Sequence, residues 1–386
     1  MSSIQKRPSG RYRARYRGPD GREHARHFDR KVDAQRWLDE ITAAVVTGQY
    51  VDPRAGRVTF REYAELWRER KANHRATTRA HVETMLRRHV YPVLGDRALS
   101  SILPGDVESL VAAMSRTLAP STVRVVHGIV ASIFRAAVRD RKVAASPCES
   151  TDNLPRKVSR RKVEPLSTGA VRALAGAVPA HLRALVVLAA GTGMRQGECL
   201  GLTLDRVDFL RRALTVDRQL VTVQGAPPFL GPPKTSASVR TIPLPQVVVD
   251  ELAAHAAVTR PLEVDVEDQS GALPVSVRVA LLFSLDDGPV RRTALSGRVW
   301  RPAVRAAGLP SGTRFHDLRH YYASLLIRHG ESVKTVQARL GHASAQETLD
   351  TYAHLWPDSD DRTRDAVDAV LGTPADSLRT AEGGER

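Results

Sequence analysis

The stretch LGHASAQETLDTYAHL, residues 340–355, decides how the C-terminal part of this chain folds and raises a question of function. Ser344 and Glu347 have the spacing of a capping box, which predicts that a short helix begins there. Helical spacing then places three residues on one apolar face: Leu349, Tyr352 and Leu355. Tyr352 is either an ordinary core tyrosine or a nucleophile served by His342, and this stretch alone favours the core interpretation.

The composition of the chain indicates a nucleic-acid partner. The 386 residues are enough for two or three domains, each with its own core. A formal net charge of +16 and a pI of about 10.4 indicate binding to a polyanion, since solubility alone rarely requires so strong a bias.

The two cysteines and the apolar segments bear on where the protein acts. Cys148 and Cys199 have no metal-ligand spacing and suggest no disulfide framework, so we expect a reduced, cytoplasmic protein. The N-terminus lacks an apolar signal region. No apolar run approaches the length of a membrane span, so no membrane association is expected.

Residues 1–55 are predicted to form a small domain. RYRARYRG has the period-2 pattern of a strand, PDGRE supplies a turn, and REHARHF is predicted to be a second strand. An amphipathic helix should follow over 29–46, with four apolar anchors: Val32, Trp37, Leu38 and Ile41. Four arginines would share one face of the first strand, which is either a solvated sheet face or a DNA-binding face: Arg11, Arg13, Arg15 and Arg17.

The remaining chain divides into a helical part and a mixed part. Four helical patterns with basic polar faces predict a helical bundle over 58–146, followed by a polar, Pro-containing linker that begins at Ser146. Helices and short strands alternate over 165–372, and 373–386 looks like a loose tail. The acidic segment EVDVEDQSG, residues 263–271, is expected to be an exposed loop. The predicted fold class is therefore multidomain α+β.

Two arginines of the mixed part are candidates for binding an anion. In RFHDLRHYYASLLIRHG, residues 314–330, His316 and Arg319 lie three apart and should neighbour each other on one helix flank. An imidazole beside a guanidinium attracts an anion such as phosphate, although a solvated flank is the alternative. In TGMRQGECLGL, Arg195 precedes a helix, where it is misplaced for the helix dipole unless it holds an anion or pairs with Glu198.

Lys234, in GPPKTSASVRTIPLP, is the only lysine between Lys162 and Lys334. It is expected at a hairpin tip, where a lysine is usually just solvated. Such a tip would also reach a DNA groove and donate a proton there.

A helix-turn-helix is the main alternative for the C-terminal stretch, with its turn at Gly341 and its second helix in the major groove. Between Ser344 and Leu355 there is no Lys or Arg, whereas Glu347 and Asp350 would face phosphates. That arrangement would weaken DNA binding, so the side chains argue against a reader helix.

Six residues in order resemble the catalytic set of the tyrosine recombinases, the phage-integrase family: Arg195, Lys234, His316, Arg319, His342 and Tyr352. Each motif is weak alone, and the order and spacings make the resemblance specific. It covers 165–371 and extends to the N-terminal regions. These look like the family's arm-type DNA-binding domain, a three-stranded sheet plus a helix, and its helical core-binding domain. No catalytic position departs from the family pattern.

The resemblance implies a reaction in which each residue type has a role. Arg195 and Arg319 would stabilise the charge of a pentavalent phosphorane while Tyr352 attacks phosphorus and forms a 3′-phosphotyrosine. His316 is the expected base, and Lys234 the expected acid for the 5′ oxygen. His342 would hydrogen-bond the phosphate or the attacking oxygen. Neither ATP nor a metal would be required, so no cofactor is expected.

The resemblance also implies a biological role. We expect a site-specific integrase of a phage or mobile element that joins double-stranded DNA attachment sites through a Holliday junction, acting as a homotetramer near the bacterial nucleoid. A host DNA-bending protein or a directionality factor would assist it. The alternatives are a chromosome or plasmid resolvase, a transposase of the same chemistry, and a catalytically silent DNA-binding regulator.

Overall fold

The computed structural model describes residues 2–18, 21–47, 50, 52, 55–71, 73–157, 162–286, 288–356 and 360–371. The chain forms two compact units, residues 1–160 and 161–386. The predicted loose tail, 373–386, lies outside the described residues. So does Pro19–Asp20, the centre of the predicted first turn.

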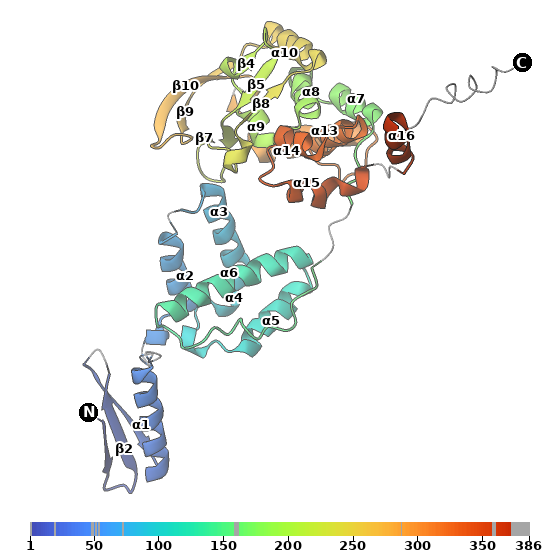
Figure 1. Cartoon of the computed structure of the whole chain (residues 1–386). Coiled ribbons are helices and arrows are strands. Elements are labelled where there is room, and N and C mark those ends of the chain that lie inside the picture. Colours follow the sequence, from blue (N-terminus) through green and yellow to red (C-terminus); the bar gives the residue numbers. More distant parts are fainter. Residues whose placement is uncertain are drawn as a thin grey trace, which may run out of the picture. The chain divides into compact units, whose positions relative to one another are not determined.

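The N-terminal unit begins with a three-stranded antiparallel sheet in the order β1-β2-β3, and the helix α1 packs on it (Figure 1). These elements are β1 (Ser2–Lys6), β2 (Tyr12–Arg17), β3 (Glu23–Phe28) and α1 (Lys31–Val46). Ala14 and Tyr16 alternate with arginines along β2 and bury against Ala34 and Leu38 of α1. The predicted strands and helix are confirmed, but Val32 is 67% exposed, so its prediction as an anchor was wrong.

A second apolar core belongs to the predicted helical bundle. It is built by α2 (Phe60–Glu69), α3 (Ala76–Met85), the π-helical segment Leu86–Val90, α4 (Tyr91–Leu94), α5 (Pro104–Ser115) and α6 (Pro120–Arg139). Thr59 caps α2 in a capping box with Glu62. The linker prediction was wrong at its start, because Cys148 and Leu154 pack on this core and Asn153 donates to the carbonyl of Glu108 over 2.8 Å.

By length and composition alone, helix α6 is long and apolar enough to span a membrane. No segment of that kind was expected from the sequence. The helix also carries charged side chains, such as Arg124 and Arg135. Seven of its residues lie in the core of the bundle, so we interpret α6 as the central helix of that bundle.

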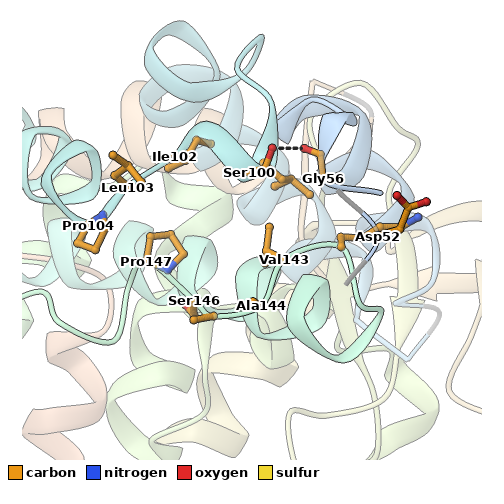
Figure 2. A pocket seen from close by; sticks show the side chains of 13 residues that line it. Asp52, Gly56, Ser100, Ile102, Leu103, Pro104, Val143, Ala144, Ser146 and Pro147 are labelled. Carbon is orange, nitrogen blue, oxygen red and sulfur yellow. Dashed lines mark hydrogen bonds between the residues drawn. The ribbon is translucent and has the colours of Figure 1, made fainter. Parts of the chain in front are cut away.

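The 3₁₀ turns Ala55–Arg57 and Leu99–Ser101 meet at one end of the bundle. Gly56 allows this approach, because a Cβ atom there would lie 2.7 Å from the Cβ of Ser100. The hydroxyl of Ser100 donates to the carbonyl of Gly56 over 3.1 Å, as Figure 2 shows beside a cavity of about 350 Å³. Val143 and Pro147 also line this cavity.

The C-terminal unit is mixed, as predicted, with helices around short sheets (Figure 1). Its helices are α7 (Thr168–Ala177), α8 (Arg183–Thr192), α9 (Gln196–Leu200), α10 (Gln246–Val258), α11 (Arg292–Ala294), α12 (Arg301–Ala306), α13 (Asp317–Arg328), α14 (Val333–Leu340), α15 (Ala345–Tyr352) and α16 (Asp360–Leu371). The buried helix α8 contacts α7, α10 and α13, and thereby connects the main core to the helices that carry the site.

The strands form an irregular hairpin with two paired sections, and a second hairpin extends its sheet. Strand β5 (Ala213–Val216) pairs with β8 (Arg240–Pro243) beside β4 (Val207–Asp208), and β6 (Gln219–Val221) pairs with β7 (Phe229–Gly231). The second hairpin, β9 (Leu262–Asp268) and β10 (Val275–Leu281), continues the sheet from β7, and the pair β11 (Ser284–Leu285) and β12 (Gly288–Pro289) follows.

The prediction of an exposed loop over 263–271 was wrong, because β9 occupies most of it. Val264 and Val266 point to the core, whereas the acidic residues between them face solvent. The segment is therefore a two-sided strand in which the charges mark only the outer face.

Candidate active site

Tyr352 ends α15 and is 1% exposed. The helix begins as predicted, because the hydroxyl of Ser344 accepts from the amide of Glu347 over 3.3 Å. The ring of Tyr352 belongs to an apolar cluster on α13 and α14, with Tyr322, Ile327, Val336 and Leu340. The core interpretation therefore holds for the ring. Leu349 is 38% exposed, so the predicted apolar face was wrong at that position.

The hydroxyl of Tyr352 lies in a polar site rather than in the core. It makes a 2.8 Å hydrogen bond with Nδ1 of His320 on α13. Burial raises the pKa of Tyr352 to about 12, against the opposing effect of the nearby charges of Arg319 and Arg195. The charges of both sequence-predicted arginines therefore favour the ionised form of the Tyr352 hydroxyl.

Arg319 is held rigidly inside the unit, where it is 2% exposed. Its Nη1 donates to the carbonyl of Gly193 over 2.7 Å, and its Nη2 donates to the carbonyl of Leu340 over 2.6 Å. Burial lowers the pKa of Arg319, but a guanidinium stays charged at neutral pH. Each guanidinium carries five N–H donors, so Arg319 keeps donors for an anion.

Arg195 precedes α9 and makes the ion pair with Glu198 that the sequence predicted, at 3.0 Å. Its Nη1 also donates to the hydroxyl of Ser238 over 3.0 Å, and its Nη2 donates to the carbonyl of Gly341 over 3.3 Å. Helix α9 ends at Leu200, five residues after Arg195.

Three arginines bind three consecutive carbonyls at the C-terminus of α14. Arg240 donates from Nε to the carbonyl of Arg339 over 2.8 Å, Arg319 binds that of Leu340, and Arg195 binds that of Gly341. Positive charge at a helix C-terminus is favourable, because the last carbonyls carry partial negative charge and have no partner within the helix. This carbonyl clamp fixes the position of the loop that carries His342.

Glu198 joins two of these arginines and is 2% exposed. Its carboxylate accepts from the amide of Arg195 over 2.9 Å and from Nη2 of Arg240 over 2.9 Å. Burial alone would raise the pKa of Glu198, but Arg240 and then Arg195 outweigh that effect and hold it below its usual value. The carboxylate thus orients Arg195 as a charged partner.

The rings of His342 and Tyr352 are nearly parallel, with their centroids 6.4 Å apart. Its Nδ1 makes a 2.8 Å hydrogen bond with the hydroxyl of Thr348. Burial, followed by the charges of Arg319 and Arg195, lowers the pKa of His342 to about 3. His342 is therefore neutral at neutral pH and can accept or donate one hydrogen bond.

His316 precedes α13 and packs edge-on against His320, with ring centroids 4.9 Å apart. Partial loss of hydration, followed by the charges of His320 and Arg319, lowers the pKa of His316 to about 4. Water still reaches the exposed residue, so solvent screening reduces the energetic weight of that shift. His316 therefore lies in the site, but the hydroxyl of Tyr352 forms its hydrogen bond with His320 and not with His316.

Lys234 is exposed and lies on the return limb of the irregular hairpin, not at its tip. The tip is the segment 222–228 between β6 and β7, so the expected position was wrong. Lys234 lies four residues before Ser238, which contacts Arg195. Four residues span at most about 14 Å, so Lys234 is tethered at the rim of the site.

The four predicted DNA-binding arginines lie at the N-terminal sheet. Arg13, Arg15 and Arg17 alternate with residues that face α1, so they share the opposite face. Glu23 lies 3.5 Å from Arg13 and 3.7 Å from Arg15, and Arg11 pairs with Asp29 at 2.8 Å. The predicted shared face is therefore present for the three arginines of β2, whereas Arg11 lies just before the strand, and carboxylates interrupt the positive charge of the face.

Sequence reasoning missed His320 and Arg240. His320 follows Arg319 in HDLRH, one helical turn after His316, so the i, i+4 spacing could have indicated it. Arg240 is 42 residues from Glu198 in sequence, and no local pattern indicates that pairing. Among the described residues, no group of three or more His, Cys, Asp or Glu side chains is arranged to hold a metal ion.

A single site on this mixed helical fold holds two arginines, three histidines and a tyrosine, and this set indicates the class of tyrosine recombinases. Three family models match the chain: the phage integrase family over 166–358, the phage integrase N-terminal domain over 2–47 and the phage integrase central domain over 60–153. The chain belongs to the phage integrase family, whose members are site-specific recombinases.

Individual proteins agree with this assignment. The chain is 30% identical to the prophage phiRv2 integrase of Mycobacterium tuberculosis, over 91% of this chain and 90% of that protein. It is 27% identical to the integrase of Mycobacterium phage D29, over 90% and 91%. The fold resembles the Tn1549 transposon integrase in complex with transposon right end DNA, with a TM-score of 0.65, 20% identity and coverage of 82% and 100%. A lambda integrase dimer bound to a core site gives a TM-score of 0.56 at 17% identity, with coverage of 92% and 96%.

Proposed function

We propose that this phage integrase cuts and rejoins double-stranded DNA at two attachment sites, with Tyr352 as the nucleophile that forms a covalent 3′-phosphotyrosine. The observation that carries the proposal is the Tyr352 hydroxyl, which is hydrogen-bonded to His320 on the helix that also carries Arg319. Arg319 and Arg195 are held at the consecutive carbonyls of Leu340 and Gly341, next to His342. A core tyrosine with a purely structural role has no need of a histidine at its hydroxyl and of two fixed guanidinium groups in the same site.

Arg195 and Arg319 have the role of binding the non-bridging oxygens of the scissile phosphate. Both guanidinium groups are oriented before DNA binds, Arg319 by two carbonyls and Arg195 by Glu198. Donors fixed in advance stabilise the developing charge of the phosphorane without reorganising during the reaction. His342, neutral and fixed by Thr348, supplies a further hydrogen bond to the phosphate.

Lys234 has the role of general acid for the departing 5′ oxygen. Its exposed position at the rim leaves it open to DNA. Docking of Ser238 on Arg195 and on the carbonyl of Gly341 limits how far the lysine can travel from the site. Binding of DNA would complete the site by drawing Lys234 inwards.

The test is covalent trapping. Purified protein is mixed with supercoiled DNA that carries the element's own junction, in EDTA and without ATP, and stopped with SDS. We expect a protein–DNA adduct and relaxed plasmid with the wild type, and neither with Tyr352→Phe. The absence of an adduct with wild-type protein on its own junction would overturn the proposal and favour a silent DNA-binding regulator.

The N-terminal domain has the role of binding a second, arm-type class of DNA site. The face formed by Arg13, Arg15 and Arg17 supports this role. Deleting residues 1–55 should abolish bridging to arm-type sites and leave core cleavage intact. Normal integration by the truncated protein would show that the domain has another role.

Recombination would take place in a tetramer on DNA, in the bacterial cytoplasm near the nucleoid, assisted by a host DNA-bending protein or a directionality factor. The lambda integrase has been solved as a tetramer bound to a Holliday junction. Here the apolar residues Val367, Val370 and Leu371 of α16 are 50–80% exposed and offer a contact for a neighbouring subunit. Removing 357–386 should weaken tetramer assembly on DNA, and unchanged assembly in native gels would contradict this role.

A further inference from the structure

The hydroxyl of Tyr352 has a specific neighbour that the catalytic set does not include. His320 Nδ1 lies 2.8 Å from Oη of Tyr352, and the two rings meet edge to face with centroids 5.6 Å apart. His320 lies in the first turns of α13, between the buried residues Arg319 and Tyr321. Its orientation is therefore set by a helix that packs directly against α8.

The protonation state of His320 follows from its surroundings. The side chain is half-buried, and burial lowers its pKa below the usual 6.5, while Asp317 opposes that effect and Arg319 adds to it. The ring edges of His316 and Tyr352 face it, and His342 is near enough to interact with its charge. His320 is therefore neutral at neutral pH, and a neutral imidazole whose Nε2 carries the proton accepts at Nδ1.

Tyr352 needs a proton acceptor more than an ordinary tyrosine does. With its pKa raised to about 12, roughly one molecule in 10⁵ would hold the tyrosinate at pH 7. A base within hydrogen-bond reach removes the proton during attack, so a preformed tyrosinate is not required. Within the described residues, His320 is the only side chain that forms a hydrogen bond with that hydroxyl.

We propose that His320 is a catalytic residue of the recombination reaction proposed above: it holds the Tyr352 hydroxyl and accepts its proton as the oxygen attacks phosphorus. The Oη–P bond forms, the proton moves from Oη to Nδ1 of His320, and the P–O5′ bond breaks. The electron pair stays on O5′, which takes a proton from the general acid. In rejoining, the 5′ hydroxyl returns its proton to the general acid as it attacks phosphorus, the Oη–P bond breaks, and the departing tyrosinate recovers its proton from His320.

This assignment gives His316 a different role from the one expected from sequence. His316 is exposed at the mouth of the site and its ring meets His320 rather than Tyr352. From that position it contacts the phosphate, while His320 contacts the nucleophile. The two histidines therefore make separable contributions to the reaction.

The experiment measures single-turnover cleavage of a nicked core-site substrate, from which the cut strand diffuses away, over pH 5 to 9. The variants are His320→Gln, His316→Gln and the control His329→Gln, which changes an exposed histidine just after the same helix. General-base catalysis contributes roughly 10²- to 10⁴-fold, so His320→Gln should lose that much while binding core DNA as the wild type does. His329→Gln should cleave at the wild-type rate.

The pH profile separates a proton acceptor from a positioning residue. Wild-type cleavage should fall below the pKa of His320 and level off above it. This plateau should be lost in His320→Gln, whose rate should keep rising with pH as Tyr352 ionises, and it should persist in His316→Gln. A His320→Gln protein that cleaves within threefold of the wild type, or that loses the same factor at every pH, would overturn the proposal.

A second measurement covers the case in which His320→Gln does not fold. Replacing Tyr352 by 3,5-difluorotyrosine lowers the pKa of the phenol without changing His320. The acid limb of cleavage should stay at the same pH if the histidine is the titrating group. A limb that moves to lower pH would show that the tyrosine itself titrates, and would exclude His320 as the acceptor.

Failure of this inference differs from failure of the proposed function. If the wild type forms an adduct that Tyr352→Phe lacks, tyrosine catalysis stands whatever the His320 variants do. If the wild type forms no adduct on its own junction, the proposed function fails before His320 is tested.

Discussion

Replacing Glu198 by glutamine should destabilise the catalytic unit and slow cleavage, because this buried carboxylate neutralises two arginines. Glu198 is 2% exposed, and the side chain of its partner Arg240 is 6% exposed. Removing one member of a buried ion pair costs about 3–5 kcal/mol, since the other charge stays buried without compensation. Glutamine keeps the size and one acceptor oxygen, so we expect the lower end, about 3 kcal/mol.

The matched control is Glu263→Gln, which removes an exposed carboxylate from the same unit. Glu263 lies 3.1 Å from Arg278, and the two side chains are 52% and 67% exposed. Exposed pairs of this kind contribute about 1 kcal/mol or less, because water screens both charges. The two substitutions are chemically identical, so the difference between them isolates burial.

The assay is hydrogen–deuterium exchange of the full chain in increasing urea, read on peptides that cover α8 and α13. These helices belong to the core of the unit, so their exchange follows its unfolding. Cleavage of core DNA, measured in parallel, should fall roughly 10²-fold, because Arg195 loses the carboxylate that orients it. If Glu198→Gln is as stable as Glu263→Gln, the carboxylate is not the partner that fixes these arginines.

Three further predictions follow from the geometry of the site. His342 stays neutral in the folded chain down to about pH 3, whereas it takes up a proton near pH 6.5 in the unfolded chain. The free energy of unfolding should therefore fall as the pH drops from 6.5 to 3, by about 1.4 kcal/mol per pH unit from this residue. Urea denaturation of His342→Gln should show a shallower fall, and an unchanged one would contradict the assignment. Gly341→Ala should destabilise the unit by at least about 1–2 kcal/mol, because φ is +64° and the new Cβ would lie 3.0 Å from Cα of Ser238; a variant with wild-type thermal stability would refute this. Lys234→Ala should slow cleavage of ordinary DNA roughly 10²-fold or more yet cleave DNA with a 5′-bridging sulfur at close to the wild-type rate, since a thiolate leaves without a proton; equal losses on both substrates would exclude the general-acid role.

The sequence predicted most helices and the residues around the nucleophile, because local patterns encode both. The capping pair Ser344 and Glu347 marks the start of α15, and the order of the motifs identifies the family. The Arg195–Glu198 ion pair could be predicted because the two residues lie three apart at the start of a helix.

The errors occurred where contacts distant in sequence decide the structure. In β9 the charges were given more weight than the alternation of Val264 and Val266 with acidic residues. The predicted three-stranded sheet is confirmed, but its strand β1 has few apolar residues and is held by backbone pairing with β2. Only the family resemblance, and no side-chain pattern, therefore implied this strand. The link between Glu198 and Arg240 joins α9 to β8, which no local spacing reports.

The carbonyl clamp at the end of α14 bears on how an inactive form of this enzyme should be made. Replacing Arg319 or Arg195 by alanine would abolish cleavage and would also remove the hydrogen bond to the carbonyl of Leu340 or Gly341. The loop that carries His342 would then lose part of its support. Such a variant would report misfolding and lost catalysis together. Tyr352→Phe removes one oxygen and leaves the ring in its apolar cluster, so it is the substitution to use when a stable, DNA-bound but non-cutting complex is wanted.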